Sequence, residues 1–201
     1  MSFARELARR ALGIRYDTLP EEALHIGRRA LADTVGVALA GADAPALDAL
    51  EDVLAIGAAP GQVTLWGRGG KRASILHAAL INGTAAHALD FDDCSTTMGG
   101  HPSAPVVPVV LGLAEAYGLP ARKVLEAWVT GVEVETRLAR GLLPHHYEKG
   151  WHPTATLGVF GATAAAGRML DLDEDQMTTA LAVTVSMASG LKSNFGTPVK
   201  P

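Results

Sequence analysis

The stretch ARKVLEAWVTGVEVETRLARGLL, residues 121–143, decides the fold class of this chain. Its apolar residues recur every three or four positions, and polar or charged residues fill the positions between them. This spacing is typical of an amphipathic helix, because 3.6 residues make one turn. The stretch therefore predicts one long helix, and the segments around it can be compared with the same pattern.

Seven further segments repeat this spacing and stop near Gly or Pro, which are common at helix ends. They cover residues 3–12, 21–41, 46–58, 74–90, 104–118, 154–170 and 173–190. Between residues 61 and 70 the chain has its only short β-branched run, so we expect at most one or two short strands near residues 62–66. The sequence predicts an all-α domain over residues 1–201, a bundle of packed antiparallel helices.

The composition narrows the classes of function and partner. The chain has 17 basic and 21 acidic side chains among 201 residues, which is unlike a nucleic-acid-binding protein. Only 19% of residues are charged and 5% aromatic, so Ala, Val, Leu and Gly must fill the interior, and the surface is poor in charge. We expect a homodimer that covers part of this surface.

Three features of the sequence bear on the cellular compartment: its cysteine content, its N-terminus and the length of its apolar runs. One cysteine, Cys94, cannot form an internal disulfide. The N-terminus has no apolar core of a signal peptide, and no apolar run reaches the roughly 20 residues that span a bilayer. We therefore expect a cytoplasmic protein without membrane contact.

Two histidines precede proline and an apolar helix, in HPSAP at 101–105 and in GWHPTATLG at 150–158. Proline is favoured at the first position of a helix, so His101 and His152 should lie at helix N-termini. The positive end of a helix disfavours imidazolium and attracts anions, which suits a neutral base beside a bound carboxylate. A capping or packing role is the alternative for either histidine alone.

Three carboxylates, Asp90, Asp92 and Asp93, lie in the loop before His101. They could bind a metal together with the histidines, orient an imidazole, or form a solvated loop. His87 and Asp90 are three residues apart and could share one helix face. The spacing is looser than that of an established metal motif, so a metal-dependent hydrolase stays an alternative and we predict no metal.

Four segments of the chain occur in a characteristic order: INGTAAHALDFDD at 81–93, HPSAPVVPV at 101–109, GWHPTATLGVFGA at 150–162 and GLKSNFGTPVKP at 190–201. Together they resemble the MmgE/PrpD family of 2-methylcitrate dehydratases and cis-aconitate decarboxylases. The resemblance extends over nearly the whole chain. It implies a lyase without cofactors that acts on small di- or tricarboxylates by dehydration, decarboxylation or epimerisation.

The resemblance also implies the site. Catalytic roles fall on Asp90, His101, His152 and Lys200. Contacts to substrate are expected from Cys94, Ser95, Ser103, Trp151 and Thr154. Relatives often have threonine where this chain has Cys94, so Ser95 or Thr96 would have to replace that hydroxyl.

The resemblance further implies a homodimer and a second α/β lid domain beyond residue 201. The chain would thus be the N-terminal part of such an enzyme, inactive by itself or completed by a separate polypeptide. A non-catalytic helical module for dimerisation or binding is the alternative from another class. It would leave the histidines scattered, whereas a lyase needs acid, base and substrate within hydrogen-bond reach.

Overall fold

A computed structural model describes residues 2–55, 61–197 and 199–200 of the chain. The described residues form nine α-helices, two 3₁₀ turns and two very short strands. The helices are α1 (Phe3–Leu12), α2 (Glu21–Gly41), α3 (Pro45–Ala55), α4 (Ile75–His87), α5 (Ser103–Tyr117), α6 (Ala121–Leu142), α7 (His145–Glu148), α8 (Pro153–Met169) and α9 (Glu174–Thr184). The predicted all-α class is confirmed.

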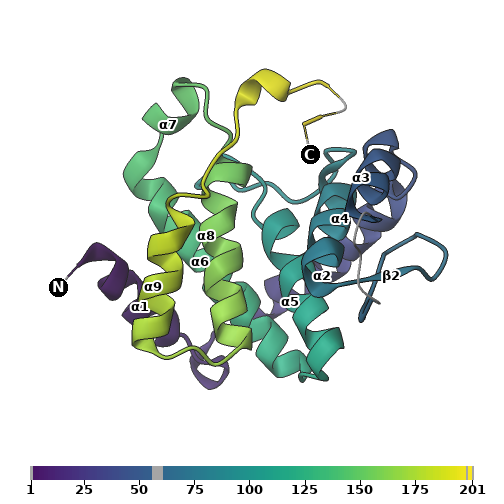
Figure 1. The fold of residues 1–201 in the computed structure, drawn as a ribbon. Coiled ribbons are helices and arrows are strands. Elements are labelled where there is room, and N and C mark those ends of the chain that lie inside the picture. Colours follow the sequence, from purple (N-terminus) through teal and green to yellow (C-terminus); the bar gives the residue numbers. More distant parts are fainter. Residues whose placement is uncertain (1, 56–60, 198, 201) are drawn as a thin grey trace.

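The helices form one bundle around α5, α6 and α8 (Figure 1). On one side α1 and α9 pack together against α6 and α8, while on the other side α2 and α4 pack against α5, and α3 packs on α4. The largest buried cluster lies between α5, α6 and α8 and is centred on Val106, Val110 and Trp128. This arrangement brings the loop after α4 and the loop before α8 to the same end of the bundle (Figure 1).

Small residues let the central helices approach closely. This agrees with the low aromatic content, because few large side chains are present to fill wider gaps. A Cβ atom on Gly131 of α6 would lie only 2.8 Å from the carbonyl oxygen of Gly161 in α8. A Cβ on Gly41 would lie 2.2 Å from the carbonyl oxygen of Ala85, where α2 meets α4. Glycine at these crossings thus allows backbone-to-backbone packing that any larger residue would push apart.

The expected short strands form a small hairpin. The strand β1 (Val63–Thr64) lies within the expected range 62–66 and pairs antiparallel with β2 (Arg72–Ala73). The strand β2 lies outside that range. The side chain of buried Asn82 on α4 accepts a hydrogen bond from the Trp66 amide (2.9 Å) and donates one to the Thr64 carbonyl (3.0 Å). The hairpin is thereby attached to the helical bundle.

Several helix ends differ from the predicted ranges, and the helix expected at 74–90 already ends at His87. The helix expected at 46–58 is observed as α3, and residues 56–58 lie outside the described residues. The helix expected to reach residue 190 ends at Thr184, and the polar loop before Trp151 contains the short helix α7. Pro153 is the first residue of α8, as predicted.

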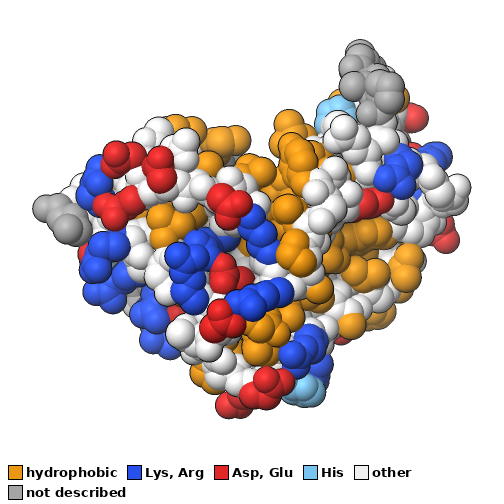
Figure 2. Space-filling view, turned by 90° about the horizontal axis from the view of Figure 1, so that it is seen from below, with side chains coloured by type: hydrophobic (Ala, Val, Ile, Leu, Met, Phe, Trp, Pro, Cys, Tyr) orange, Lys and Arg blue, Asp and Glu red, His pale blue; other side chains and the backbone are white. Residues whose placement is uncertain are grey.

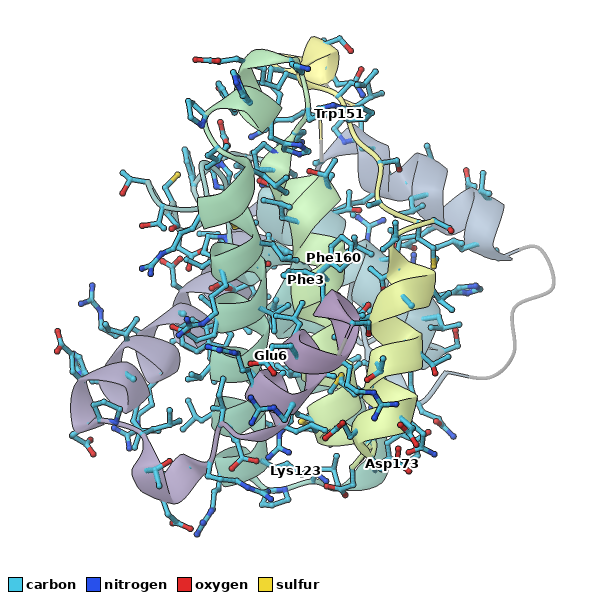
Figure 3. All side chains as sticks on the ribbon, turned by 90° about the vertical axis from the view of Figure 1, so that its left-hand side faces the viewer. Phe3, Glu6, Lys123, Trp151, Phe160 and Asp173 are labelled. Atoms are coloured by element: carbon cyan, nitrogen blue, oxygen red, sulfur yellow. The ribbon has the colours of Figure 1, made fainter. Side chains whose placement is uncertain are left out.

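The described helices were also compared with the length and hydropathy of a membrane span. None of them meets both requirements alone, and α2 and α3 meet them only as a pair whose axes bend by 91°. Figure 3 shows the two ends of the bundle, with Trp151 at one and Lys123 and Asp173 at the other. The candidate site lies at the Trp151 end.

Candidate active site

Three segments far apart in the sequence meet at this end of the bundle. They are the loop between α4 and α5, the start of α8 and the tail that follows α9. The tail is held by hydrogen bonds from the His152 amide to the Gly190 carbonyl (3.1 Å) and from the Lys192 amide to the Gly150 carbonyl (2.8 Å). This pairing brings the last described residues across the end of α4.

The three segments enclose a cavity of about 260 Å³. All four residues with predicted catalytic roles line it, as do three of the five predicted substrate contacts. The lining residues are Asp90, Cys94, Ser95, Thr96, Gly99, Gly100, His101, Tyr147, His152, Thr154, Phe195 and Lys200. His101 and His152 therefore lie in one place, which disagrees with the scattered arrangement expected of a non-catalytic module.

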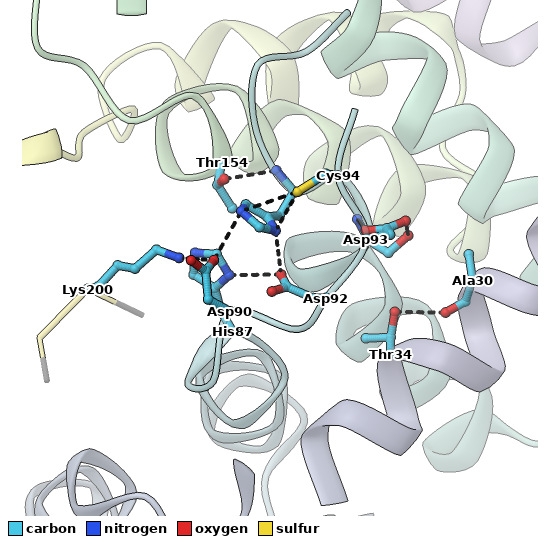
Figure 4. Close-up of polar contacts among 11 residues, drawn as sticks. Ala30, Thr34, His87, Asp90, Asp92, Asp93, Cys94, Thr154 and Lys200 are labelled. Carbon is cyan, nitrogen blue, oxygen red and sulfur yellow. Dashed lines mark hydrogen bonds and ion pairs between the residues drawn. The ribbon is translucent and has the colours of Figure 1, made fainter. Parts of the chain in front are cut away.

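Asp92 is buried beside these residues, and two histidine rings lie against it (Figure 4). Its Oδ2 atom is 2.8 Å from Nδ1 of His87 and 3.3 Å from Nδ1 of His101. Burial alone would raise the pKa of this carboxyl, but hydrogen bonds from His101 and His87 outweigh burial and lower the pKa to about 2. Asp92 is thus a buried permanent anion at neutral pH.

His101 lies between two carboxylates. While Nδ1 lies beside Asp92, Nε2 is 3.3 Å from Oδ1 of Asp90. A carboxylate only accepts hydrogen bonds, so this arrangement suits a ring protonated on both nitrogens. Burial lowers the pKa of His101, but the hydrogen bond and charge of Asp92 outweigh it, so that the net pKa is raised.

The backbone of His101 is anchored to the next segment of the site. Its amide donates to Oγ1 of Thr154 at 3.0 Å, so the first turn of α8 fixes the position of the loop before α5. A Cβ on the preceding Gly100 would lie 2.9 Å from both the amide nitrogen and Oγ1 of Thr154. The close approach of the two segments therefore requires glycine at position 100.

His152 has the opposite electrostatic environment. It is the N-cap residue of α8, and its ring lies 5.6 Å from that of His87 and 4.8 Å, edge to face, from that of Phe195. Burial, followed by repulsion from His87 and Lys200, lowers the pKa of His152 to about 4. The ring is neutral at pH 7, as expected at the positive end of a helix.

Lys200 reaches the cavity from the tail and pairs with Oδ1 of Asp90. The hydrogen bond from Lys200 lowers the pKa of Asp90, although burial opposes this shift. Asp90 has a left-handed backbone conformation (φ 59°), which aspartate tolerates better than most residues. This conformation follows directly after α4 and turns the loop toward the cavity.

Two of the predicted substrate contacts do not line the cavity. Ser103 is fully buried, and its hydroxyl donates to Asp93 (2.6 Å) and accepts from Nε1 of Trp128 (3.2 Å). Trp151 stacks on His146 with ring centroids 6.0 Å apart. Ser103 therefore supports the loop between α4 and α5 through Asp93, and Trp151 packs on His146 outside the cavity. Cys94 does line the cavity, with Sγ 3.7 and 3.8 Å from the two ring nitrogens of His101.

Two residues at the centre of the site, His87 and Asp92, were not among the predicted site residues. The sequence contained a signal for both, since they lie in the HALDFDD segment and are five positions apart. Helical geometry suggested a pairing of His87 with Asp90, but α4 ends at His87. Asp90 therefore turns toward His101 and Lys200, and Asp92 takes the place beside His87.

The same cluster has the donor atoms for a metal ion. One ligand atom from each of His87, Asp90, Asp92 and His101 lies within 4.8 Å of the others. Two imidazoles and two carboxylates suit a divalent transition metal. In the structure, however, the Lys200 ammonium occupies Oδ1 of Asp90, and a divalent cation would compete with it.

Known proteins resemble this chain over almost its whole length. The MmgE/PrpD N-terminal domain model matches residues 5–201. Human cis-aconitate decarboxylase is 30% identical over 194 residues, which cover 94% of this chain and 40% of the human protein. The mouse enzyme is 31% identical over the same shares, and that of Aspergillus terreus is 25% identical over 97% of this chain and 41% of its own length. The chain thus spans about two fifths of these relatives.

Proposed function

The chain belongs to the MmgE/PrpD family, and we propose that it is the helical N-terminal domain, residues 1–201, of a lyase that acts on small di- or tricarboxylates. The favoured reaction is decarboxylation of a substrate such as cis-aconitate, which the names of the relatives indicate. Dehydration or epimerisation next to a carboxylate would use the same groups.

The observation that carries this proposal is the contrast between the surroundings of two histidines in one cavity. His101 lies between two carboxylates and has a raised pKa, while His152 is buried beside cations and has a pKa of about 4. Neighbouring titratable groups whose pKa values are pushed apart are typical of an acid and a base. We assign His101 as the proton donor and His152 as the proton acceptor.

These assignments account for the chemistry of a decarboxylation. The bond between carbon and one carboxylate breaks, carbon dioxide leaves, and the electron pair moves into the carbon skeleton. His101 donates a proton to the carbon that receives this pair, and solvent then reprotonates the ring. In a dehydration, His152 would remove the proton next to a carboxylate while His101 protonates the leaving hydroxyl.

Substrate carboxylates need fixed cationic and hydrogen-bonding partners. Lys200 supplies an ammonium group whose side chain is only 12% exposed, so its attraction for an anion is weakly screened. A substrate carboxylate would replace Asp90 as its partner, as in other charge-assisted pairs. Ser95 and Thr154 offer hydroxyl groups at the wall of the cavity, and Cys94 stands beside His101.

We also propose that the working protein is a cytoplasmic homodimer completed by a lid, supplied by further sequence or by a separate polypeptide. Large apolar side chains that are more than half exposed support such an assembly. They include Leu39, Val53, Leu76, Phe91, Val183, Val185 and Met187. The lid would exclude water and hold the substrate, which is a large part of the rate in most enzymes.

The test is turnover followed by proton NMR with cis-aconitate and 2-methylcitrate. The chain is assayed alone and together with the polypeptide encoded directly downstream. Appearance of a decarboxylated or dehydrated product in either sample, and its loss in the His101→Gln variant, supports the proposal. No product in either sample, together with no binding of cis-aconitate, would leave a non-catalytic module as the better reading.

A further inference from the structure

A second, larger cavity adjoins the candidate site. Its volume is about 500 Å³, and it shares His152, Thr154 and Lys200 with the smaller one. Its remaining lining residues are Ala79, Leu80, Gly83, Thr84, His87, Ala104, Pro105, Val109, Ala155, Gly190, Leu191, Asn194 and Val199. The size is within the range of ligand pockets, and the shared residues make it continuous with the site.

The larger cavity has a polar end and an apolar end. The polar end is the shared one, and His87 also lines it with a ring that is buried and whose Nε2 atom has no hydrogen-bond partner among the described residues. A ligand group at this end of the cavity can supply the hydrogen-bond partner that Nε2 lacks.

The apolar end follows one face of α4. Ala79, Gly83 and His87 are spaced by four residues and therefore lie in a row, which spans about 12 Å along the helix axis. Ala79 and Gly83 are small, and the apolar side chains of Val109, Leu191 and Val199 also line this cavity. Figure 2 shows hydrophobic side chains along the rim of an indentation of the molecule.

We propose that the substrate is amphipathic, a polycarboxylate that carries an unbranched alkyl chain of several carbons. Its carboxylates would lie at Lys200 and the histidines, and its alkyl chain would lie along Ala79 and Gly83. Leu191 is 50% exposed and Val199 66% exposed, so the chain would cover apolar surface that otherwise faces water. This inference rests on the proposed function, but it concerns a different part of the cavity.

The experiment compares the dissociation constants of succinate, butylsuccinate and octylsuccinate by titration calorimetry, at concentrations below micelle formation. All three ligands share two carboxylates and differ only in the alkyl chain. Each methylene that becomes fully buried should lower Kd about fourfold, and a partly covered one about twofold. We expect octylsuccinate to bind at least 100-fold more tightly than succinate.

Two variants show where the chain binds. Ala79→Leu fills the apolar end and should cancel most of the gain while leaving succinate affinity within about twofold of the original. Ala49→Leu makes the same change on the exposed face of α3 and should keep the full gain. A gain that persists in Ala79→Leu would place the alkyl chain elsewhere and overturn the inference.

An affinity that does not change along the ligand series would also overturn the inference. If Ala79→Leu then lowers the molecular mass measured by light scattering, the cavity is covered by a second copy of the chain instead of a ligand. Failure of the proposed function would give a different result. Each of the three ligands would then bind to the Lys200→Met variant as tightly as to the original chain. The alkyl increment and the dependence on Lys200 are thus read from separate comparisons.

Discussion

His87 donates a hydrogen bond from Nδ1 to Oδ2 of Asp92 over 2.8 Å, between two side chains that are almost completely buried. An ionised carboxylate cannot donate, so this contact fixes the tautomer of the imidazole. The same oxygen lies beside His101. One buried anion therefore orients two rings of the candidate site.

Replacing Asp92 with asparagine should lower the pKa of His101, because the neighbouring negative charge that favours the protonated ring is lost. The proposed acid would then be deprotonated at neutral pH, and we expect kcat to fall by about 100-fold or more. Nitrogen-15 NMR titration of the histidines measures the pKa directly. Asp43→Asn changes an exposed carboxylate elsewhere and serves as the control. An unchanged His101 titration would contradict the assigned role of Asp92.

Replacing Lys200 with methionine keeps the aliphatic part of the side chain and removes its charge. Loss of one charge-assisted contact corresponds to about 1.5–3 kcal/mol, so the Kd for cis-aconitate should rise about 10- to 100-fold. The matched control is Lys123→Met, because Lys123 pairs with Asp171 at the opposite end of the bundle. Equal affinity of the two variants would remove Lys200 from the proposed binding site.

The ring of His152 should remain neutral as the pH falls to about 4, because burial lowers its pKa from 6.5 to that value. The unfolded chain takes up this proton near pH 6.5 and the folded chain does not. Stability linked to His152 is therefore present above pH 6.5 and is lost as the pH falls from 6.5 to about 4. Urea unfolding at pH 7 and pH 5 measures this, with His152→Gln showing a smaller loss. An equal loss in both proteins would contradict a low pKa.

Glu135 on α6 is fully buried, and neither of its carboxyl oxygens has a hydrogen-bond partner among the residues described. Burial raises its pKa well above 4.5, so the folded chain keeps the proton and the unfolded chain loses it above pH 4.5. The contribution of Glu135 to stability is therefore lost as the pH rises. We expect Glu135→Gln to be as stable as the original chain near pH 4 and more stable at pH 8.

Chemical denaturation over this pH range tests the Glu135 prediction. The matched control is Glu133→Gln, because Glu133 is exposed on the same helix and pairs with Arg137. Its stability difference from the original chain should not grow with pH. A Glu135→Gln difference that is constant between pH 4 and pH 8 would mean that the carboxyl is ionised inside the protein.

The metal-dependent alternative makes a distinct prediction about removal of ions. If His101 acts as an acid, turnover should be unchanged after dialysis against EDTA. Added zinc should inhibit, because the ion would compete with Lys200 for Asp90 and occupy the rings of His87 and His101. Loss of turnover with EDTA and its recovery with zinc would favour a metal enzyme. Elemental analysis of the purified protein provides an independent measurement.

Local patterns in the sequence were sufficient for the helices and for the motif residues of the site. Apolar spacing located α6, and proline in front of an apolar run located the start of α8, since both signals act within one or two turns. The resemblance of four segments to one family indicated Asp90, His101, His152 and Lys200, and all four line one cavity. Their proposed roles depend on the experiments above.

Only the tertiary structure decided what surrounds each of these groups. Asp92 became the central anion because α4 ends at His87 and the next residues turn, so that Asp90 pairs with His101 and Lys200 and Asp92 pairs with His87. Ser103 was withdrawn from the cavity because Asp93 and Trp128 hold its hydroxyl. The pKa of His101 is raised and that of His152 is lowered, although both histidines precede proline. Burial and the charges near each ring cause this difference. Sequence spacing records which residues follow one another, whereas protonation depends on desolvation and on charges that only the fold brings together.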